Sequence, residues 1–180
     1  DFNEVMWFYP SSDSDEIDRY VLYNYIEGVW SIGTMVRTAW IEAHLENNPI
    51  AAGKTGTDSN YLYNQEFGHD DDDSAMTAYI ETADFDIQDG NNFMLVSKVI
   101  SDIQFRDADS ENELDVSIKG RDYPSDSLST LSTSSLTSST QQAFVRCRSR
   151  QAVLRFESSG SGYGWRLGYF RLDTRLDGRQ

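Results

Sequence analysis

The chain has 180 residues, with 30 acidic residues against 15 Lys and Arg, so its formal net charge is −15. A single Cys excludes an internal disulfide and any metal cluster built from several cysteines. No apolar run is long enough for a membrane span, and an aromatic content of 13% argues against disorder because such a chain can bury a core.

Short runs of aromatic and β-branched residues alternate along the chain with clusters of Gly, Asn, Asp and Ser, a pattern typical of strands. Long apolar stripes at helical spacing are missing. We therefore expect an all-β fold. The runs predicted as strands are 5–9, 20–25, 29–41, 61–67, 76–87, 93–105, 114–119, 143–149, 151–157 and 165–176.

Two short segments carry the residues of hairpin turns. Glu27-Gly28 separates the runs 23–25 and 29–32, and the segment 89–92 (Asp-Gly-Asn-Asn) separates 85–87 from 93–96. Gly and Asn tolerate the positive φ angles that tight hairpins need. Both segments are predicted to connect paired strands.

Residues 125–142 consist almost entirely of Ser and Thr, with three Leu among them. Their apolar area is too small to offset the entropy of ordering them alone. The strand pattern resumes at Phe144, so the segment is predicted as a long loop inserted between strands. A loop of this length would become ordered against a neighbouring surface.

Four consecutive aspartates, Asp70, Asp71, Asp72 and Asp73, are a weak candidate for a Ca²⁺ site, since this ion prefers carboxylate oxygens. Alternate side chains of an extended chain diverge, however, so a solvated loop is the better interpretation and no metal is expected. Sequence motifs of nucleophilic, phosphate-binding or zinc enzymes are absent. A glycosidase-like pair of carboxylates stays open, because 30 acids allow very many pairs.

The charge is distributed unevenly along the chain. Residues 1–120 carry 25 acids and 6 bases, whereas residues 121–180 carry 5 acids and 9 bases, all of them Arg. In the run 143–149, alternation places Cys147 on one face and arginines on the other, so Cys147 is predicted to be a buried strand residue. The arginines could hold phosphates, a partner's carboxylates or the acidic part of this chain, and pairing within or between subunits is favoured.

Residues 19–40 resemble one blade edge of a kelch-type β-propeller, where a strand with Tyr23, Asn24 and Tyr25 ends in a turn and Trp30 opens the next strand. With the preceding residues 6–12, and with 145–157 and 165–173 near the end, the passage resembles the tail hub, or packaged-DNA stabilisation, proteins of short-tailed bacteriophages. The resemblance implies propeller-type strands over 1–70, too few to close a propeller, and an antiparallel β-sandwich-like domain over 71–180 with the loop at 125–142.

The resemblance also implies a structural virion protein located in the phage tail, as a hub or nozzle. Copies of the chain would form a ring, expected to be a hexamer, around the DNA exit channel. The ring would contact portal or adaptor proteins and dock tail fibre or needle proteins. DNA would pass without being read by sequence, and acidic walls would keep it from sticking. No enzymatic activity and no cofactor are expected.

Under this interpretation, the candidate functional residues serve packing and assembly. A glycan-binding β-module or adhesin is the alternative, since exposed Trp and Tyr on a β-surface stack on sugar rings, and a hydrolase with paired carboxylates ranks third. The expected core or inter-blade anchors are Trp7, Tyr23, Tyr25, Trp30 and Trp40; the expected ion-pairing residues are Arg146, Arg148, Arg150 and Arg155; and Trp165 is expected to cap a Gly-rich hairpin loop.

Overall fold

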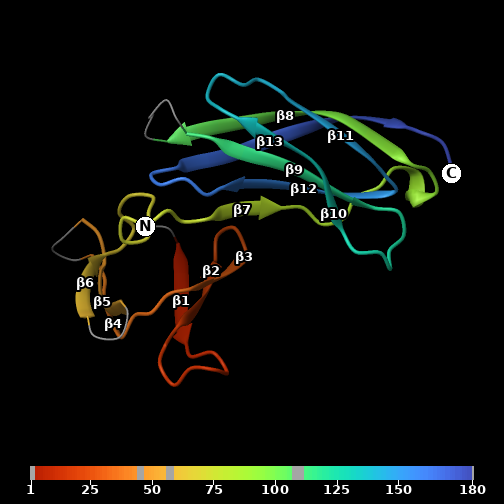
Figure 1. Ribbon diagram of the computed structural model, residues 1–180. Coiled ribbons are helices and arrows are strands. Elements are labelled where there is room, and N and C mark those ends of the chain that lie inside the picture. Colours follow the sequence, from red (N-terminus) through yellow and green to blue (C-terminus); the bar gives the residue numbers. More distant parts are fainter. Residues whose placement is uncertain (1–2, 44–46, 56–58, 107–111, 180) are drawn as a thin grey trace. The chain divides into compact units, whose positions relative to one another are not determined.

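The computed structural model describes residues 3–43, 47–55, 59–106 and 112–179 (Figure 1). The chain divides into two compact units, Asp1–Phe67 and Gly68–Gln180. The described residues form thirteen strands, and every pair of neighbouring strands is antiparallel. Their one helical element is a 3-10 turn, η1 (Gln88–Gly90). The expected all-β class is confirmed.

The first unit contains two small sheets, each a meander in which consecutive strands pair. The hairpin predicted at Glu27-Gly28 is confirmed, because Asn24 pairs with Val29 around it and Gly28 has a φ of +70°. The described residues contain no propeller, so the two meanders stand as separate three-stranded sheets. Their strands are β1 (Glu4–Tyr9), β2 (Arg19–Asn24), β3 (Val29–Thr34), β4 (Ala39–Ile41), β5 (Ile50–Thr55) and β6 (Ser59–Asn64).

Two strand predictions in this unit were wrong in detail. The run 29–41 is divided between β3 and β4, and β5 was not predicted at all. The β5 sequence is rich in Ala and Gly, which have low strand propensity. Its Gly53 lies so close to the chain that a Cβ there would come within 2.6 Å of the Val36 carbonyl oxygen. Close backbone packing, rather than side-chain preference, therefore accounts for this strand.

The second unit contains a four-stranded sheet in the order β10-β9-β12-β7 and a three-stranded sheet in the order β11-β8-β13. Figure 1 shows these sheets in colours that run from yellow (β7) through green and teal to blue. Their strands are β7 (Ala78–Glu81), β8 (Met94–Arg106), β9 (Leu114–Arg121), β10 (Ser129–Leu136), β11 (Ala143–Ser149), β12 (Gln151–Ser158) and β13 (Gly164–Leu176).

One hydrophobic core joins the two sheets of the second unit. Met94, Val96 and Val99 of β8 contribute to it from one sheet, and Leu154 and Phe156 of β12 from the other. Core side chains alternate with exposed ones along the strands, most regularly in β9 and β11. The two sheets thus enclose a shared core as the layers of a β-sandwich do.

The Ser/Thr-rich segment 125–142, predicted as a loop, contains strand β10. This strand pairs with β9 from Ser129 opposite Gly120 to Leu136 opposite Leu114. Leu136 is 1% exposed and belongs to the core. The prediction failed because it considered only the apolar area of the segment itself. In the structure, hydrogen bonds to β9 satisfy the backbone of β10, and Leu136 packs in the core.

The second predicted hairpin, at 89–92, was also wrong. Strand β7 pairs with β12 in one sheet, whereas β8 pairs with β11 and β13 in the other. The segment between β7 and β8 therefore crosses from one sheet to the other and does not join paired strands. The segment contains part of η1 and Gly90 with a φ of +68°, so it does turn, but the partner of each strand depends on the whole sheet.

Candidate assembly surface

One face of the sheet β1-β2-β3 carries a continuous set of apolar side chains. Side chains of directly opposed residues lie on the same face of an antiparallel pair. The register places Val5 opposite Tyr23, Trp7 opposite Val21, Tyr23 opposite Trp30 and Val21 opposite Ile32. We call this set the aromatic face; its members are Val5, Trp7, Tyr9, Val21, Tyr23, Trp30 and Ile32.

Solvent reaches most of the aromatic face. Ile32 is 78% exposed, Trp30 61% and Trp7 48%. Two contacts hold its rings together: the centroids of Tyr23 and Trp30 are 4.4 Å apart, and those of Trp7 and Trp30 are 6.0 Å apart, both in stacked geometry. The rings therefore form an ordered surface even though they do not form a core.

The opposite face of the same sheet packs inside the unit. Phe8 contacts Tyr20 with a centroid distance of 6.4 Å and Trp40 with one of 5.6 Å. The Tyr20 ring lies where a side chain at Gly33 would otherwise point. Trp40 is thus the expected anchor that packs inward, whereas Trp7 and Trp30 are not core residues of this unit.

Tyr25 lies in the turn after β2 and is 54% exposed. Its hydroxyl donates a hydrogen bond to Oδ1 of Asn3 at 3.2 Å, and the backbone N–H of Tyr25 donates to the Asn3 carbonyl at 3.1 Å. These contacts close the open end of the meander. Tyr25 therefore anchors the turn beside the aromatic face without belonging to it.

The first unit has almost no buried core of its own. Among the described residues, Ala51 is its only fully buried hydrophobic residue, and the others all belong to the second unit. A unit of this size buries a smaller fraction of its surface than a larger domain does, so its stability is marginal. The first unit therefore exposes the apolar area that a core of its own would normally cover.

The predicted alternation in β11 is confirmed, since Val145, Cys147 and Ser149 are buried while Arg146 and Arg148 are exposed. Cys147 is fully buried, and its Sγ lies 3.3 Å from Oγ of Ser149. Burial raises the pKa of the Cys147 thiol. These residues make a packed interior without a reactive thiolate.

Two of the predicted arginines are held by the end of the chain and by the β7–β8 connection. Arg148 donates from Nε to Oδ2 of Asp177 at 2.6 Å, and its guanidinium lies 4.0 Å from the Phe93 ring centroid. Arg150 donates to the carbonyls of Asn91 at 2.8 Å and Arg179 at 3.0 Å. Both arginines thus make contacts within the chain.

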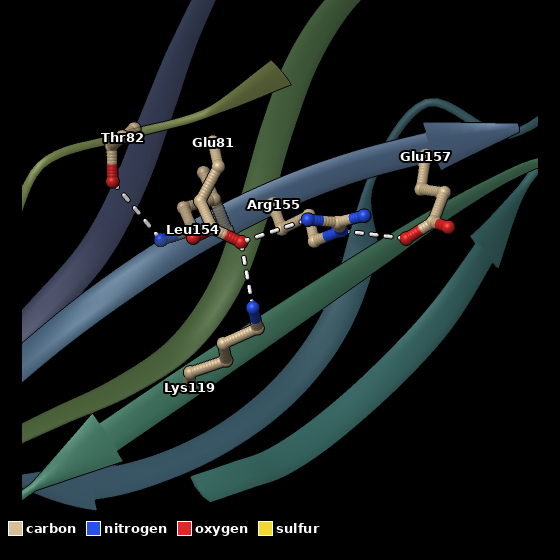
Figure 2. Close-up of polar contacts among 6 residues, drawn as sticks. All are labelled: Glu81, Thr82, Lys119, Leu154, Arg155 and Glu157. Carbon is tan, nitrogen blue, oxygen red and sulfur yellow. Dashed lines mark hydrogen bonds and ion pairs between the residues drawn. The ribbon is translucent and has the colours of Figure 1, made fainter. Parts of the chain in front are cut away.

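A third predicted arginine, Arg155, lies in an ion-pair network on the outer face of the four-stranded sheet (Figure 2). Its Nε donates to Oε2 of Glu157 at 2.6 Å, and its Nη1 donates to Oε2 of Glu81 at 3.2 Å. Lys119 donates to the same Glu81 oxygen at 2.6 Å. The bond to Glu157 raises the pKa of Arg155, and that from Lys119 lowers the pKa of Glu81.

Trp165 closes the connection between β12 and β13. Its indole Nε1 donates to Oγ of Ser158 at 2.8 Å, and its ring packs against the core. The four aspartates stand close to the same connection: Asp70 accepts hydrogen bonds from the Gly162 N–H at 2.6 Å and from the Ser161 hydroxyl at 2.7 Å. Within the described residues, no group of three potential metal ligands converges.

Comparison with protein-family models gives no match, and neither does comparison with curated protein sequences. In the part of the chain that the structure describes, no helix has the length and apolar character needed to cross a membrane.

Sequence reasoning singled out Trp7, Tyr23 and Trp30 as anchors but missed Tyr9 and the aliphatic members of the aromatic face. Alternation along 5–9 and 29–32 was available as a signal, since it places Val5 with Trp7 and Ile32 with Trp30. What joins the two runs into one face is the register around Glu27-Gly28, which fixes Tyr23 opposite Trp30. The surface thus depends on one hairpin.

Proposed function

We propose that this chain is a structural assembly protein of a virion, a component of a bacteriophage tail hub or nozzle. In this proposal, copies of the chain form a ring around the DNA exit channel and dock other tail parts. One observation carries it: the first unit exposes an ordered aromatic face while burying almost no core of its own. Exposed apolar surfaces of this kind mark sites of protein association.

The strand order of the first unit supports the same proposal. Propeller blades are meanders of four antiparallel strands. The sheets β1-β2-β3 and β4-β5-β6 are consecutive meanders of three strands each, and we propose that they are propeller-type sheets. Single repeats of such architectures cannot bury their faces and depend on neighbours to cover them.

The charge of the chain supports a passage for DNA. Residues 1–67 carry 11 acids and 3 bases, which disfavours phosphate contacts in the first unit. In the proposed ring, acidic residues line the channel, repel the duplex and let it move without sequence-dependent contacts. The proposal assigns the chain no catalytic role and no cofactor.

The mass of the native particle tests this proposal. The expected result is a species of several times 20.5 kDa that persists on dilution. Ile32→Lys puts a charge on the most exposed member of the aromatic face and is expected to dissociate the particle. Ser31→Lys, at an exposed position on the opposite face of β3, is the matched control and should leave the mass unchanged. A folded wild-type monomer of 20.5 kDa would contradict the proposal.

A glycan-binding module or adhesin is the second candidate, favoured by the stacked and exposed rings of Trp7 and Trp30. Such rings can pack against the apolar faces of sugars. Binding of the monomeric chain to an oligosaccharide array, lost in Trp7→Ala and Trp30→Ala, would favour this function. Absence of glycan binding together with a large native particle would favour assembly.

A further inference from the structure

The outer face of the sheet β11-β8-β13 concentrates positive charge in an acidic protein. Along β8 and β13, Ile103, Phe105, Trp165, Leu167 and Leu172 pack against the core, so the alternating residues between them face outward. Five of these outward residues are bases, and the outward residues of β11 add Arg146 and Arg148. We call them the arginine face: Lys98, Arg106, Arg146, Arg148, Arg166, Arg171 and Arg175.

Cross-strand pairing makes these bases one surface. Leu95 of β8 lies opposite Arg148 on one side and Arg175 on the other. Arg171 lies opposite Ile100, and Arg166 lies opposite Gln104. Neighbouring strands lie about 4.8 Å apart, so the bases form a band that follows the long β8–β13 ladder. Such a band can bind an extended or repeated set of anions.

In the other sheet of the same unit, the outward-facing bases form ion pairs with carboxylates. On its outer face Lys119, Arg121 and Arg155 each pair with a carboxylate, of Glu81, Asp84 or Glu157. On the arginine face, Arg148 pairs with Asp177. Within the described residues, the structure pairs none of the other arginines of this face with a carboxylate.

These unmatched arginines occur in a chain with a twofold excess of acids. Outside the arginine face, and apart from Asp102, Asp173 and Asp177 beside it, the chain carries 27 acids and 8 bases. A second copy therefore offers the complementary charge that the arginine face lacks. Arg rather than Lys is the residue expected at such an interface, since its planar guanidinium pairs with carboxylates through two hydrogen bonds.

The segment 71–73 is the part of a second copy best placed to supply carboxylates. Asp71, Asp72 and Asp73 are exposed. The segment is held at both sides: Asp70 binds the 161–162 turn, and the backbones of Asp71 and Ser74 exchange hydrogen bonds of 2.9 and 3.0 Å. An anchored loop loses less entropy on binding than a mobile one.

We infer that the arginine face binds the Asp71, Asp72 and Asp73 segment of a second copy of this chain. This inference rests on the proposed assembly and adds to it a second contact, distinct from the aromatic face. The two partner surfaces are different, so the contact is head-to-tail. Repetition of a head-to-tail contact closes a ring when the rotation between subunits permits it.

Charge reversal tests the pairing. The triple variant R166E/R171E/R175E is expected to weaken self-association about tenfold or more, and D71K/D72K/D73K should do the same. The chain carrying all six substitutions has the wild-type net charge with the signs exchanged, and it should assemble again. R166K/R171K/R175K keeps the positive charge but loses the paired hydrogen bonds of the guanidinium, so it should weaken self-association less than the charge reversal does. Sedimentation velocity gives the masses, and circular dichroism verifies that each variant is folded.

Three results would overturn the inference. Either triple reversal could assemble like the wild type, or the six-fold variant could stay dissociated although folded. The third is binding of single-stranded DNA by the wild type that R166E/R171E/R175E abolishes while the particle mass stays unchanged. Tyr169, 89% exposed, and Phe144, 70% exposed, could stack on bases in that case.

These results separate the inference from the proposed function. A wild-type chain that is monomeric at every concentration removes the proposed ring and the inferred contact together. A particle that dissociates with Ile32→Lys but not with R166E/R171E/R175E leaves the assembly function standing and overturns the arginine-face contact alone. Restoration by the six-fold variant supports both.

Discussion

Tyr23 and Trp30 stand directly opposite each other on β2 and β3, and their rings stack with centroids 4.4 Å apart. The pair spans the hairpin built on Glu27-Gly28, and Trp7 of β1 extends it at a centroid distance of 6.0 Å from Trp30. Trp30 lies on the edge strand β3 and thus contacts rings from both other strands of the sheet. It is the central ring of the aromatic face.

Trp30→Ala should therefore affect assembly more than folding. Loss of the stacked pair is expected to cost about 1 kcal/mol of unfolding free energy. If the face is a contact surface, loss of this central ring should weaken self-association about tenfold or more. Sedimentation velocity over a dilution series, with denaturant unfolding alongside, separates the two effects. Ile26→Ala, a 70% exposed turn residue, is the control and should leave self-association unchanged.

Strand β10 offers a test of why the Ser/Thr-rich segment is ordered. Leu136 is 1% exposed, whereas Leu131 of the same strand is 43% exposed. Leu136→Ala should lower the unfolding free energy by about 2–5 kcal/mol, because it leaves a cavity in the core. Leu131→Ala should cost less than about 1 kcal/mol. Equal effects in denaturant titrations would mean that β10 does not pack as described.

The Glu81 carboxylate predicts a pH dependence. Its hydrogen bond from Lys119 and the second one from Arg155 lower its pKa in the folded protein. The stabilisation is present above the unfolded pKa of about 4.3 and is lost as the pH falls through the lower folded value. Glu81→Gln should thus cost at most about 1 kcal/mol at pH 7, a difference that shrinks toward pH 3.

Exposed Glu113 provides the control for this profile. Glu113→Gln, just before β9, removes one negative charge outside this ion-pair network and is the matched control for the loss of a carboxylate. A Glu81→Gln variant whose deficit stays constant from pH 7 to pH 3 would show that the charge of Glu81 contributes nothing to stability.

The Cys147 thiol should be unreactive toward thiol reagents in the folded protein. Its burial raises the thiol pKa and blocks access of reagents. A disulfide reagent such as DTNB is expected to react with the unfolded chain within seconds and with the native chain at the rate of opening of the second unit. Fast labelling under native conditions would contradict the packing of β11.

Cys147→Ala complements the labelling experiment. It removes the sulfur from a fully buried position and should lower the unfolding free energy by about 1 kcal/mol through the cavity left behind. It should also abolish labelling altogether, which verifies that the reagent reports this thiol alone, since the chain has one Cys.

Sequence patterns predicted the structure correctly where the structure depends on a few neighbouring residues. Alternation placed Cys147 inside and Arg146 and Arg148 outside, and Glu27-Gly28 marked a hairpin that the structure contains. The same reasoning failed for β10, because a Ser/Thr strand is stabilised by its partner β9 and not by its own composition. It failed at 89–92 because a turn signal does not state which strands pair on either side.

The amino-acid sequence by itself determined the all-β class, the strand faces of β11 and the excess of negative charge, since these depend on side-chain chemistry and a period of two residues. Only the tertiary structure decided which residues share a surface. The aromatic face needs the register of three strands, and the arginine face needs β8 to lie between β11 and β13. Residues such as Arg148 and Arg175 are far apart in the chain, and hydrogen bonding between strands brings them to either side of Leu95.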